Sequence, residues 1–322
     1  MKKLVVRVAL LLLVVAAGIA IYAYQQVTTL ASERVTDDVS VLFGMGGNAG
    51  VLRTERGSVI VDTMTFRMQG ERIREEAERL TGREAVVVMN THYHGDHTHG
   101  NPAFPAGTRV VATRRTRELL DAFDAGAWSG AAAETLPNET FDTTHEIKLG
   151  GKTVRASYLG RGHTSGDLVA LFVEDRVLHA GDLLFNHRYP NIDLEAGGSI
   201  EQWIGTLDRV LAMDGYDRVI PGHGAVTDRE GIRQFQSFLK EVWEQVSAAV
   251  HENRSLDETL RSVQLTQDAG YEAIAVPRRP TPTSTIRQRW SSPRIVRNSS
   301  VSRCTEYPRP CFLLLRLPIV RP

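Results

Sequence analysis

The sequence predicts a single layered α/β domain of roughly 240 residues, in the range 30–276. Short apolar segments of strand length alternate along this range with amphipathic segments that have helical spacing. Two pairs of apolar segments are separated by the turn signals Gly150-Gly151 and Glu174-Asp175, which indicates antiparallel hairpins. Hairpins combined with interspersed helices favour β-sheets covered by helices around one hydrophobic core.

The individual elements can be assigned in chain order. We expect buried strands at 58–62, 85–89 and 109–112, and the two hairpins at 146–158 and 168–179. A charged helix is expected at 72–80, ended by Gly82, and an Arg-rich helix follows Thr113, a candidate N-cap. Three further helix starts have capping-box spacing: Ser199 with Gln202, Thr227 with Glu230, and Ser255 with Glu258.

Four side chains that can bind metal lie directly after the expected strand at 85–89. The segment reads Thr91-His92-Tyr93-His94-Gly95-Asp96-His97. Packing alone explains it poorly, because imidazoles in contact repel when protonated and need buried partners when neutral. In an extended loop His92 and His94 project to one side, whereas Asp96 and His97 can turn toward another. This arrangement favours two metal ions over one.

This segment resembles the H-x-H-x-D-H signature of the metallo-β-lactamase superfamily, and further motifs of that family follow in the same order. The segment 162–167 is similar to the third motif and supplies His163. The segment 178–185 is similar to the fourth and supplies Asp182, and 220–224 is similar to the fifth and supplies His223. The resemblance extends from residue 41 to residue 238.

The resemblance implies an αββα sandwich with the site at one edge, and a zinc-dependent hydrolase that holds two Zn²⁺ ions per chain. It assigns one ion to His92, His94 and His163 and the other to Asp96, His97 and His223, with Asp182 and a water between them. Imidazole and carboxylate suit zinc and leave room for solvent. Bound zinc lowers the pKa of water from ~16 to about 7 and polarises a carbonyl.

We therefore expect a metal-bound hydroxide to attack the carbonyl of a small ester, thioester, lactone or β-lactam. The family suggests Asp96 as a catalytic residue that orients this nucleophile or carries its proton. Asp62, at the end of a strand, is either a turn residue or a residue that bonds a ligand imidazole from behind. His99 and His179 lie outside the ligand pattern, so we expect neither to bind metal. Two arginines, Arg161 and Arg188, are either solvated or available to a substrate carboxylate.

Residues 1–24 are predicted to be a signal peptide or an N-terminal membrane anchor. Lys2 and Lys3 precede an apolar run that, after Arg7, continues from Val8 to Tyr24. The small residues at 18–20 offer a cleavage site, but bulky apolar residues follow it, so both outcomes stay open. We expect an exported protein that is periplasmic or extracellular, or is anchored to the membrane by this segment.

The range 277–322 is predicted to be a basic, Pro- and Arg-rich tail that is disordered or not native to the fold. It contains ten arginines, eight of the 13 prolines and both cysteines, so the body has no thiol to bind metal. Between Val8 and Val276 the chain has 37 acidic and 25 basic residues, although the net charge is zero. Such a body repels phosphate backbones, which disfavours nucleic acid as a partner and leaves a small-molecule substrate.

Three other functions compete with a general hydrolase. A β-lactamase proper suits an exported enzyme, but no further residue specifies a β-lactam over a lactone or thioester. A persulfide dioxygenase shares the H-x-H-x-D-H run but holds one iron with two histidines and one aspartate, so metal content separates these functions. A non-catalytic metal-binding protein of the cell envelope would bind metal without turnover.

Overall fold

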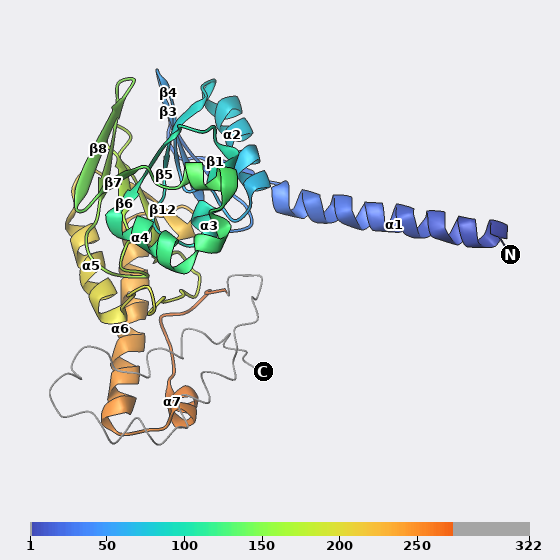
Figure 1. The fold of residues 1–322 in the computed structure, drawn as a ribbon. Coiled ribbons are helices and arrows are strands. Elements are labelled where there is room, and N and C mark those ends of the chain that lie inside the picture. Colours follow the sequence, from blue (N-terminus) through green and yellow to red (C-terminus); the bar gives the residue numbers. More distant parts are fainter. Residues whose placement is uncertain (1, 273–322) are drawn as a thin grey trace.

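The computed structural model describes residues 2–272. They form two mixed β-sheets packed face to face, with helices on both outer sides, and a long N-terminal helix that projects away from this body (Figure 1). This is the αββα sandwich expected from the sequence. The tail predicted at 277–322, with both cysteines, lies outside the described residues.

The first sheet has seven strands in sequence order, from β1 to β7. Strands β1 to β4 pair with antiparallel neighbours, and the pairs from β4 to β7 are parallel. Their bounds are β1 (Ala31–Arg34), β2 (Val39–Phe43), β3 (Ala49–Thr54), β4 (Gly57–Val61), β5 (Ala85–Met89), β6 (Arg109–Thr113) and β7 (Glu139–Phe141).

The second sheet has five strands in the order β12-β11-β10-β9-β8. Its neighbours are antiparallel, except that β11 and β12 run parallel. Their bounds are β8 (Thr144–Leu149), β9 (Lys152–Ser157), β10 (Val169–Phe172), β11 (Val177–Phe185) and β12 (Arg218–His223). Both predicted hairpins are therefore confirmed, as β8 with β9 and as β10 with β11.

Seven α-helices and three short 3-10 helices complete the described residues. The α-helices are α1 (Lys2–Thr28), α2 (Arg67–Thr81), α3 (Gly95–Thr98), α4 (Arg114–Phe123), α5 (Ile200–Ala212), α6 (Arg229–His251) and α7 (Leu256–Ser262). The 3-10 helices are η1 (Asn101–Ala103), η2 (Ala125–Ala127) and η3 (Gly130–Thr135).

Apolar side chains fill the space between the two sheets. Val59 and Val87 of the first sheet belong to one buried cluster with Val154 and Phe172 of the second. All four are almost completely inaccessible to solvent. Burying one such side chain stabilises a fold by about 1.5–3 kcal/mol, so this layer holds the two sheets together.

Helices cover the outer face of each sheet. On the first sheet, Ile73 and Ala77 of α2 pack with Ile60 of β4. On the second, Trp203 of α5 and Phe235 of α6 share a cluster with residues of β11. These outer cores hold each sheet against its helices. The ends of strands β5, β11 and β12 remain available to form a site.

The helix caps test the predicted helix starts. Thr113 caps α4, Ser199 caps α5 through its side chain, and Ser255 forms the expected capping box with Glu258. The prediction for Thr227 is wrong, because Asp228 is the N-cap of α6. The backbone of Thr227 instead pairs with that of Val219 in β12.

The loop after β5 is pressed against the segment that follows β4. A Cβ atom added at Gly100 would lie 1.9 Å from the carbonyl oxygen of Thr63. The Thr63 hydroxyl bonds Asn101 at 2.8 Å in the same contact. Only a glycine allows the two backbones to approach this closely.

We predict that Gly100→Ala destabilises the protein, because the backbone of Thr63 must move to admit the methyl group. The expected loss is about 1–3 kcal/mol, or roughly 2–10 °C in Tm for a domain of this size. Thermal unfolding followed by circular dichroism measures it. Gly126→Ala is the matched control, since a Cβ atom there meets nothing within 4 Å. Equal Tm values for the two variants would contradict the packing argument.

Candidate metal centre

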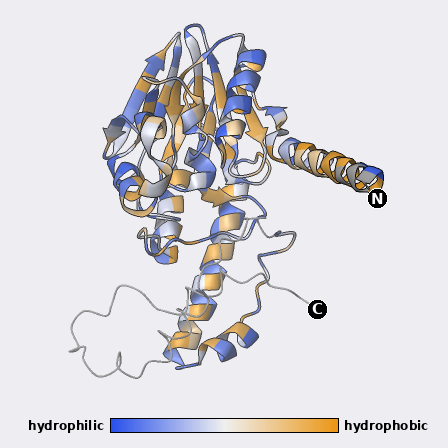
Figure 2. Ribbon diagram, turned by 45° about the vertical axis from the view of Figure 1, so that its right-hand side comes forward, coloured by the Kyte–Doolittle hydropathy of each residue, from blue (hydrophilic) through white to orange (hydrophobic). Residues whose placement is uncertain are grey.

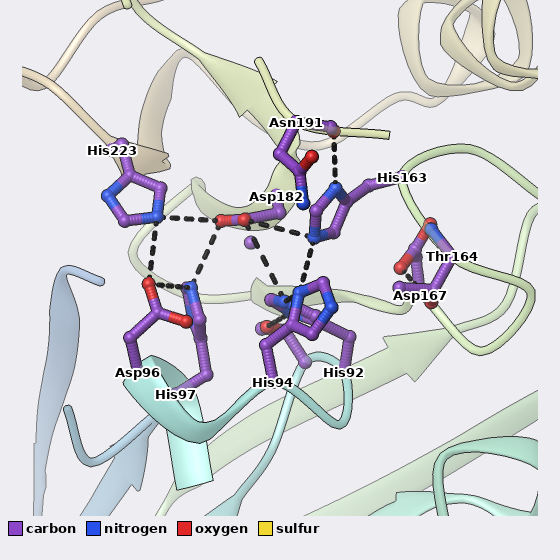
Figure 3. Close-up of polar contacts among 12 residues, drawn as sticks. His92, His94, Asp96, His97, His163, Thr164, Asp167, Asp182, Asn191 and His223 are labelled. Carbon is purple, nitrogen blue, oxygen red and sulfur yellow. Dashed lines mark hydrogen bonds and ion pairs between the residues drawn. The ribbon is translucent and has the colours of Figure 1, made fainter. Parts of the chain in front are cut away.

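Loops at the ends of strands from both sheets bring the predicted ligands together. The turn after β5 and the short helix α3 carry the H-x-H-x-D-H residues, the β9–β10 connection carries His163, and strands β11 and β12 carry Asp182 and His223. Figure 3 shows these side chains pointing toward one another. They form two groups whose ligand atoms lie within 4.8 Å of one another: His92, His94, His163 and Asp182, and Asp96, His97 and His223. The grouping agrees with the assignment implied by the resemblance.

The Asp182 carboxylate lies between the two groups. Its Oδ2 is 3.3 Å from Nε2 of His163 and 3.7 Å from Nε2 of His92. Its Oδ1 is 3.1 Å from Nε2 of His97 and 3.5 Å from Nε2 of His223. Each oxygen therefore faces one group, as a carboxylate bridging two cations would.

Hydrogen bonds on the far side of the imidazoles fix which nitrogens face the centre. His163 donates from Nδ1 to the carbonyl of Asn191 at 2.7 Å, and His94 donates from Nε2 to Asp193 at 2.9 Å. These partners assign the proton of each neutral ring to its outer nitrogen. The inner nitrogens, Nδ1 of His94 and Nε2 of His163, are only 2.7 Å apart. Two lone pairs facing each other at this distance repel, and a shared cation removes the repulsion.

The second group also suits a bound cation, because two polar atoms there are buried without partners in the described part of the chain. Nε2 of His97 and Oδ1 of Asp182 are buried, lie 3.1 Å apart and have no hydrogen-bond partner among residues 2–272. Buried polar atoms without a partner are costly. A metal ion coordinated by both atoms would satisfy them, so the donor set fits a divalent cation.

Asp62 orients one imidazole of each group. Its Oδ2 accepts a hydrogen bond from Nδ1 of His97 at 2.7 Å. Oδ2 also accepts from the Thr91 hydroxyl at 2.7 Å, and Oδ1 accepts from the Thr91 backbone N–H at 2.8 Å. The Thr91 hydroxyl lies 3.1 Å from Nδ1 of His92. Asp62 is completely buried. The structure thus supports the second of the two sequence interpretations, that Asp62 bonds a ligand imidazole from behind.

The pKa values of the histidines differ between the two groups. Burial lowers the pKa of His163 to about 4 and holds the pKa of His92 well below its usual value. Burial acts in the same direction on His223, but the Asp182 and Asp96 carboxylates outweigh it and raise its pKa to about 9. A cation entering the second group must displace a proton from His223. Metal retention there is therefore expected to fall as the pH falls.

Two glycines allow the centre to be this compact. A Cβ atom at Gly222 would lie 2.0 Å from Oδ1 of Asp182, and one at Gly47 would lie 2.2 Å from the ring of His97. Any larger residue would push a ligand out of place. Gly222 belongs to the fifth motif, whereas Gly47 lies in the β2–β3 loop, which no predicted motif includes.

Sequence reasoning missed Asp193. This carboxylate accepts hydrogen bonds from Nε2 of His94 and from the Tyr93 hydroxyl, and its other oxygen accepts from the backbone of Ala196. It therefore sets the orientation in which His94 presents Nδ1 to the centre. Nothing in the local sequence marks it, because Asp193 lies in a loop and reaches His94 only through the tertiary fold.

Other residues considered from the sequence have partners outside the two groups. His99 bonds Asp124 at 2.6 Å, and His179 is buried under β3, where Gly50 makes room for its ring. Arg161 donates to the carbonyl of Gly197, and Arg188 pairs with Glu272. Neither histidine belongs to the two candidate metal groups of residues 2–272.

An αββα sandwich whose edge holds two His/Asp groups with a carboxylate between them is the architecture of a metallo-hydrolase with two candidate metal sites. Residues 42–223 match the metallo-beta-lactamase superfamily. This match covers more than half of the chain, and the chain belongs to that superfamily.

Relatives of the chain include a protein named as a metallo-beta-lactamase and one named as lactamase-like. It is 27% identical over 181 residues to metallo-beta-lactamase IND-1 of Chryseobacterium indologenes, covering 55% of this chain and 71% of the relative. It is also 27% identical over 248 residues to the lactamase-like protein aptB of Emericella nidulans, covering 70% and 71%. Among solved structures, a metallo-beta-lactamase from Pontibacter korlensis aligns with a TM-score of 0.58 at 21% identity, over 66% of this chain and 99% of that one. The last likeness concerns the fold alone.

We predict that Asp62→Asn weakens metal binding by both groups. Asp62 accepts three hydrogen bonds with two oxygens, whereas an amide has one acceptor oxygen and would set its NH₂ against a donor from Thr91 or His97. Loss of such a supporting carboxylate typically costs about 10–100-fold in metal affinity. Competition with a chelator, followed by metal analysis, measures the change. Asp142→Asn is the control, because that exposed carboxylate pairs only with Arg114 in the described residues; equal affinities in both variants would contradict the role of Asp62.

Proposed function

We propose that this protein is a zinc-dependent hydrolase that binds two Zn²⁺ ions and attacks the carbonyl of a small ester, thioester, lactone or β-lactam. The observation that carries the proposal is the Asp182 carboxylate, which lies between the two groups and approaches two imidazoles of each. Histidine and aspartate are ligands that zinc accepts. When bound, two such ions activate water as a nucleophile and polarise the carbonyl under attack.

The chain itself supplies a carboxylate at the opening of the centre. The side chain of Asp96 is 34% exposed, more than those of the other ligands, and lies 3.3 Å from Nε2 of His223. Burial acts to raise the pKa of Asp96, but His97 and His223 outweigh it and hold that pKa well below its usual value. Asp96 therefore stays ionised at neutral pH. Of the two roles that the family suggests, a lowered pKa favours orientation over proton transfer, and we propose that Asp96 orients the attacking water by accepting a hydrogen bond from it.

A β-lactamase proper is the second candidate, favoured by the relative from Chryseobacterium indologenes. The lactamase-like relative supports the broader substrate class equally well. A persulfide dioxygenase is less favoured, because one iron held by two histidines and one aspartate would leave the remaining ligands of both groups without a metal. Nucleic acid remains a disfavoured partner, since the body between Val8 and Val276 is acidic.

The N-terminal helix has the length and composition of a signal sequence or an anchor. We propose that the metal centre lies outside the cytoplasm. Lys2, Lys3 and Arg7 precede the apolar run, and such cations favour the cytoplasmic side of a membrane. The folded body follows the run and would therefore be translocated.

Asp182→Ala is expected to lower zinc content and to abolish turnover together, because one carboxylate serves both groups. Zinc per chain, measured by atomic emission, and hydrolysis are followed on the same preparation. Asp217→Ala is the matched control, since Asp217 is exposed and pairs with Arg176 on the surface. Full activity in Asp182→Ala would refute a centre built on a shared carboxylate.

A substrate panel tests the reaction class. We expect a cephalosporin, a lactone or a glutathione thioester to be hydrolysed, and a phosphodiester to be left intact, because the acidic body repels polyanions. Activity should disappear with a chelator and return with zinc. Zinc-restored activity confined to the phosphodiester would keep the metal centre and overturn the carbonyl assignment. A single iron per chain would overturn the hydrolase itself.

A further inference from the structure

The N-terminal helix α1 leaves the body as a single apolar rod. Within residues 2–272 it is the one helix long and apolar enough to cross a membrane, over Leu10–Thr28, and the apolar part of this stretch is not buried against the body. Figures 1 and 2 show it projecting away from both sheets, mostly in the colour of hydrophobic residues. At 1.5 Å per residue the 19 residues span roughly 28 Å, close to the thickness of a bilayer's hydrocarbon core.

The helix is attached to the body without a linker. Thr28, its last residue, is 6% exposed, and Leu30 packs on the core beneath α2. A Cβ atom at Gly44 would meet both Leu30 and Met64, at 2.6 and 2.8 Å, which places these two side chains side by side. A body joined this directly to a membrane-spanning helix must rest on the membrane surface.

The surface beside this attachment is apolar. Outside α1, the large hydrophobic side chains exposed on the described body are Phe66, Met68 and Phe123. Met68 directly precedes Gln69, and the backbone N–H of Phe66 donates to the Gln69 side chain at 3.2 Å. The Gln69 amide contacts Met64 at 3.7 Å, and Met64 lies beside Leu30, so Phe66 and Met68 lie near the place where α1 joins the body. Helix α1 also contacts α2, whose first turn contains Met68. Phe123, at the end of α4, belongs to another part of the surface.

The last turns of α1 have the composition of a membrane interface. Tyr22 and Tyr24 are exposed, and Gln25 and Gln26 follow them. Tyrosine is enriched at the level of lipid headgroups. Only two residues separate Gln25 from the buried Thr28, a rise of roughly 4.5 Å along the helix. The headgroup layer therefore reaches the level of Phe66 and Met68.

We propose that α1 is retained in the mature protein as a membrane anchor and that Phe66 and Met68 form, with its last turns, an apolar collar that inserts among the headgroups of the outer leaflet. The occupant of this collar is a lipid bilayer. Removal of the residues before Ile21 would leave Ile21, Tyr22, Tyr24 and the collar exposed to water on a rigid stub, an apolar surface of the kind that soluble monomers avoid. The inference goes beyond the proposed reaction and does not depend on it.

Site-directed labelling of the full chain tests the collar. In a background of Cys304→Ser and Cys311→Ser, the variants Phe66→Cys, Met68→Cys and Phe123→Cys are each labelled with an environment-sensitive fluorophore. The protein is reconstituted in phosphatidylcholine and phosphatidylglycerol vesicles, and quenching by headgroup-level nitroxide lipids is measured. Labels at 66 and 68 are expected to lose most of their fluorescence, and the label at 123 to keep it. Equal quenching at the three positions would overturn the collar.

The mass of the native protein extracted from membranes tests the anchor. We expect an intact chain that begins before Leu10. Cleavage anywhere between Gly18 and Thr28 would overturn retention of α1. Because neither measurement uses activity, failure here is distinct from failure of the zinc hydrolase proposal.

Discussion

The carboxylate of Asp62 is the constraint on which the metal centre depends. It is completely buried, and it holds His97 directly and His92 through the Thr91 hydroxyl. A buried carboxylate without partners would be prohibitively costly, so the protein supplies donors on every side of it. Because those donors belong to ligand residues or their neighbours, satisfying Asp62 also fixes the rings. The residue adopts a positive φ of 65°, a conformation that aspartate tolerates better than most residues, so the chain turns sharply out of β4 there.

The position of the second sheet relative to the first is also tightly constrained at the metal centre. Asp182 lies within β11, and Gly222 in β12 passes so close that any side chain there would displace its carboxylate. The parallel pairing of β11 with β12 sets this approach. The amide of Asn48, in the β2–β3 loop, donates to the carbonyls of Pro221 and Gly224 and so ties the two sheets together beside the site. Packing between the sheets therefore determines the distances between ligands, not the ligand loop alone.

The seven candidate ligands were predictable because each belongs to a motif whose order and spacing are local. The hairpins and three of the helix caps were predictable for the same reason. Other features depend on contacts between distant segments. Strand β1, with four exposed residues, has no strand pattern of its own and exists through pairing with β2. The cap of α6 moves from Thr227 to Asp228 because Thr227 pairs with Val219. Asp193 reaches His94 across about a hundred positions, so no reading of local sequence could have found it.

The helical layer on the second sheet also shapes the chemistry. Phe185 stacks on His223 at 5.2 Å between ring centroids and also contacts His163, while Trp203 of α5 lies behind both. Trp203 satisfies its own N–H by donating to the carbonyl of Leu183 at 3.0 Å, so it can occupy this position without an unpaired polar group. The aromatic wall excludes water from the back of the centre and lowers the local dielectric, which strengthens every charge interaction among the ligands. The most exposed ligands are Asp96 and His94, so solvent reaches the centre from their side. The same packing that stabilises the fold thus gives the centre one dry side and one open side, an arrangement that suits the proposed hydrolase.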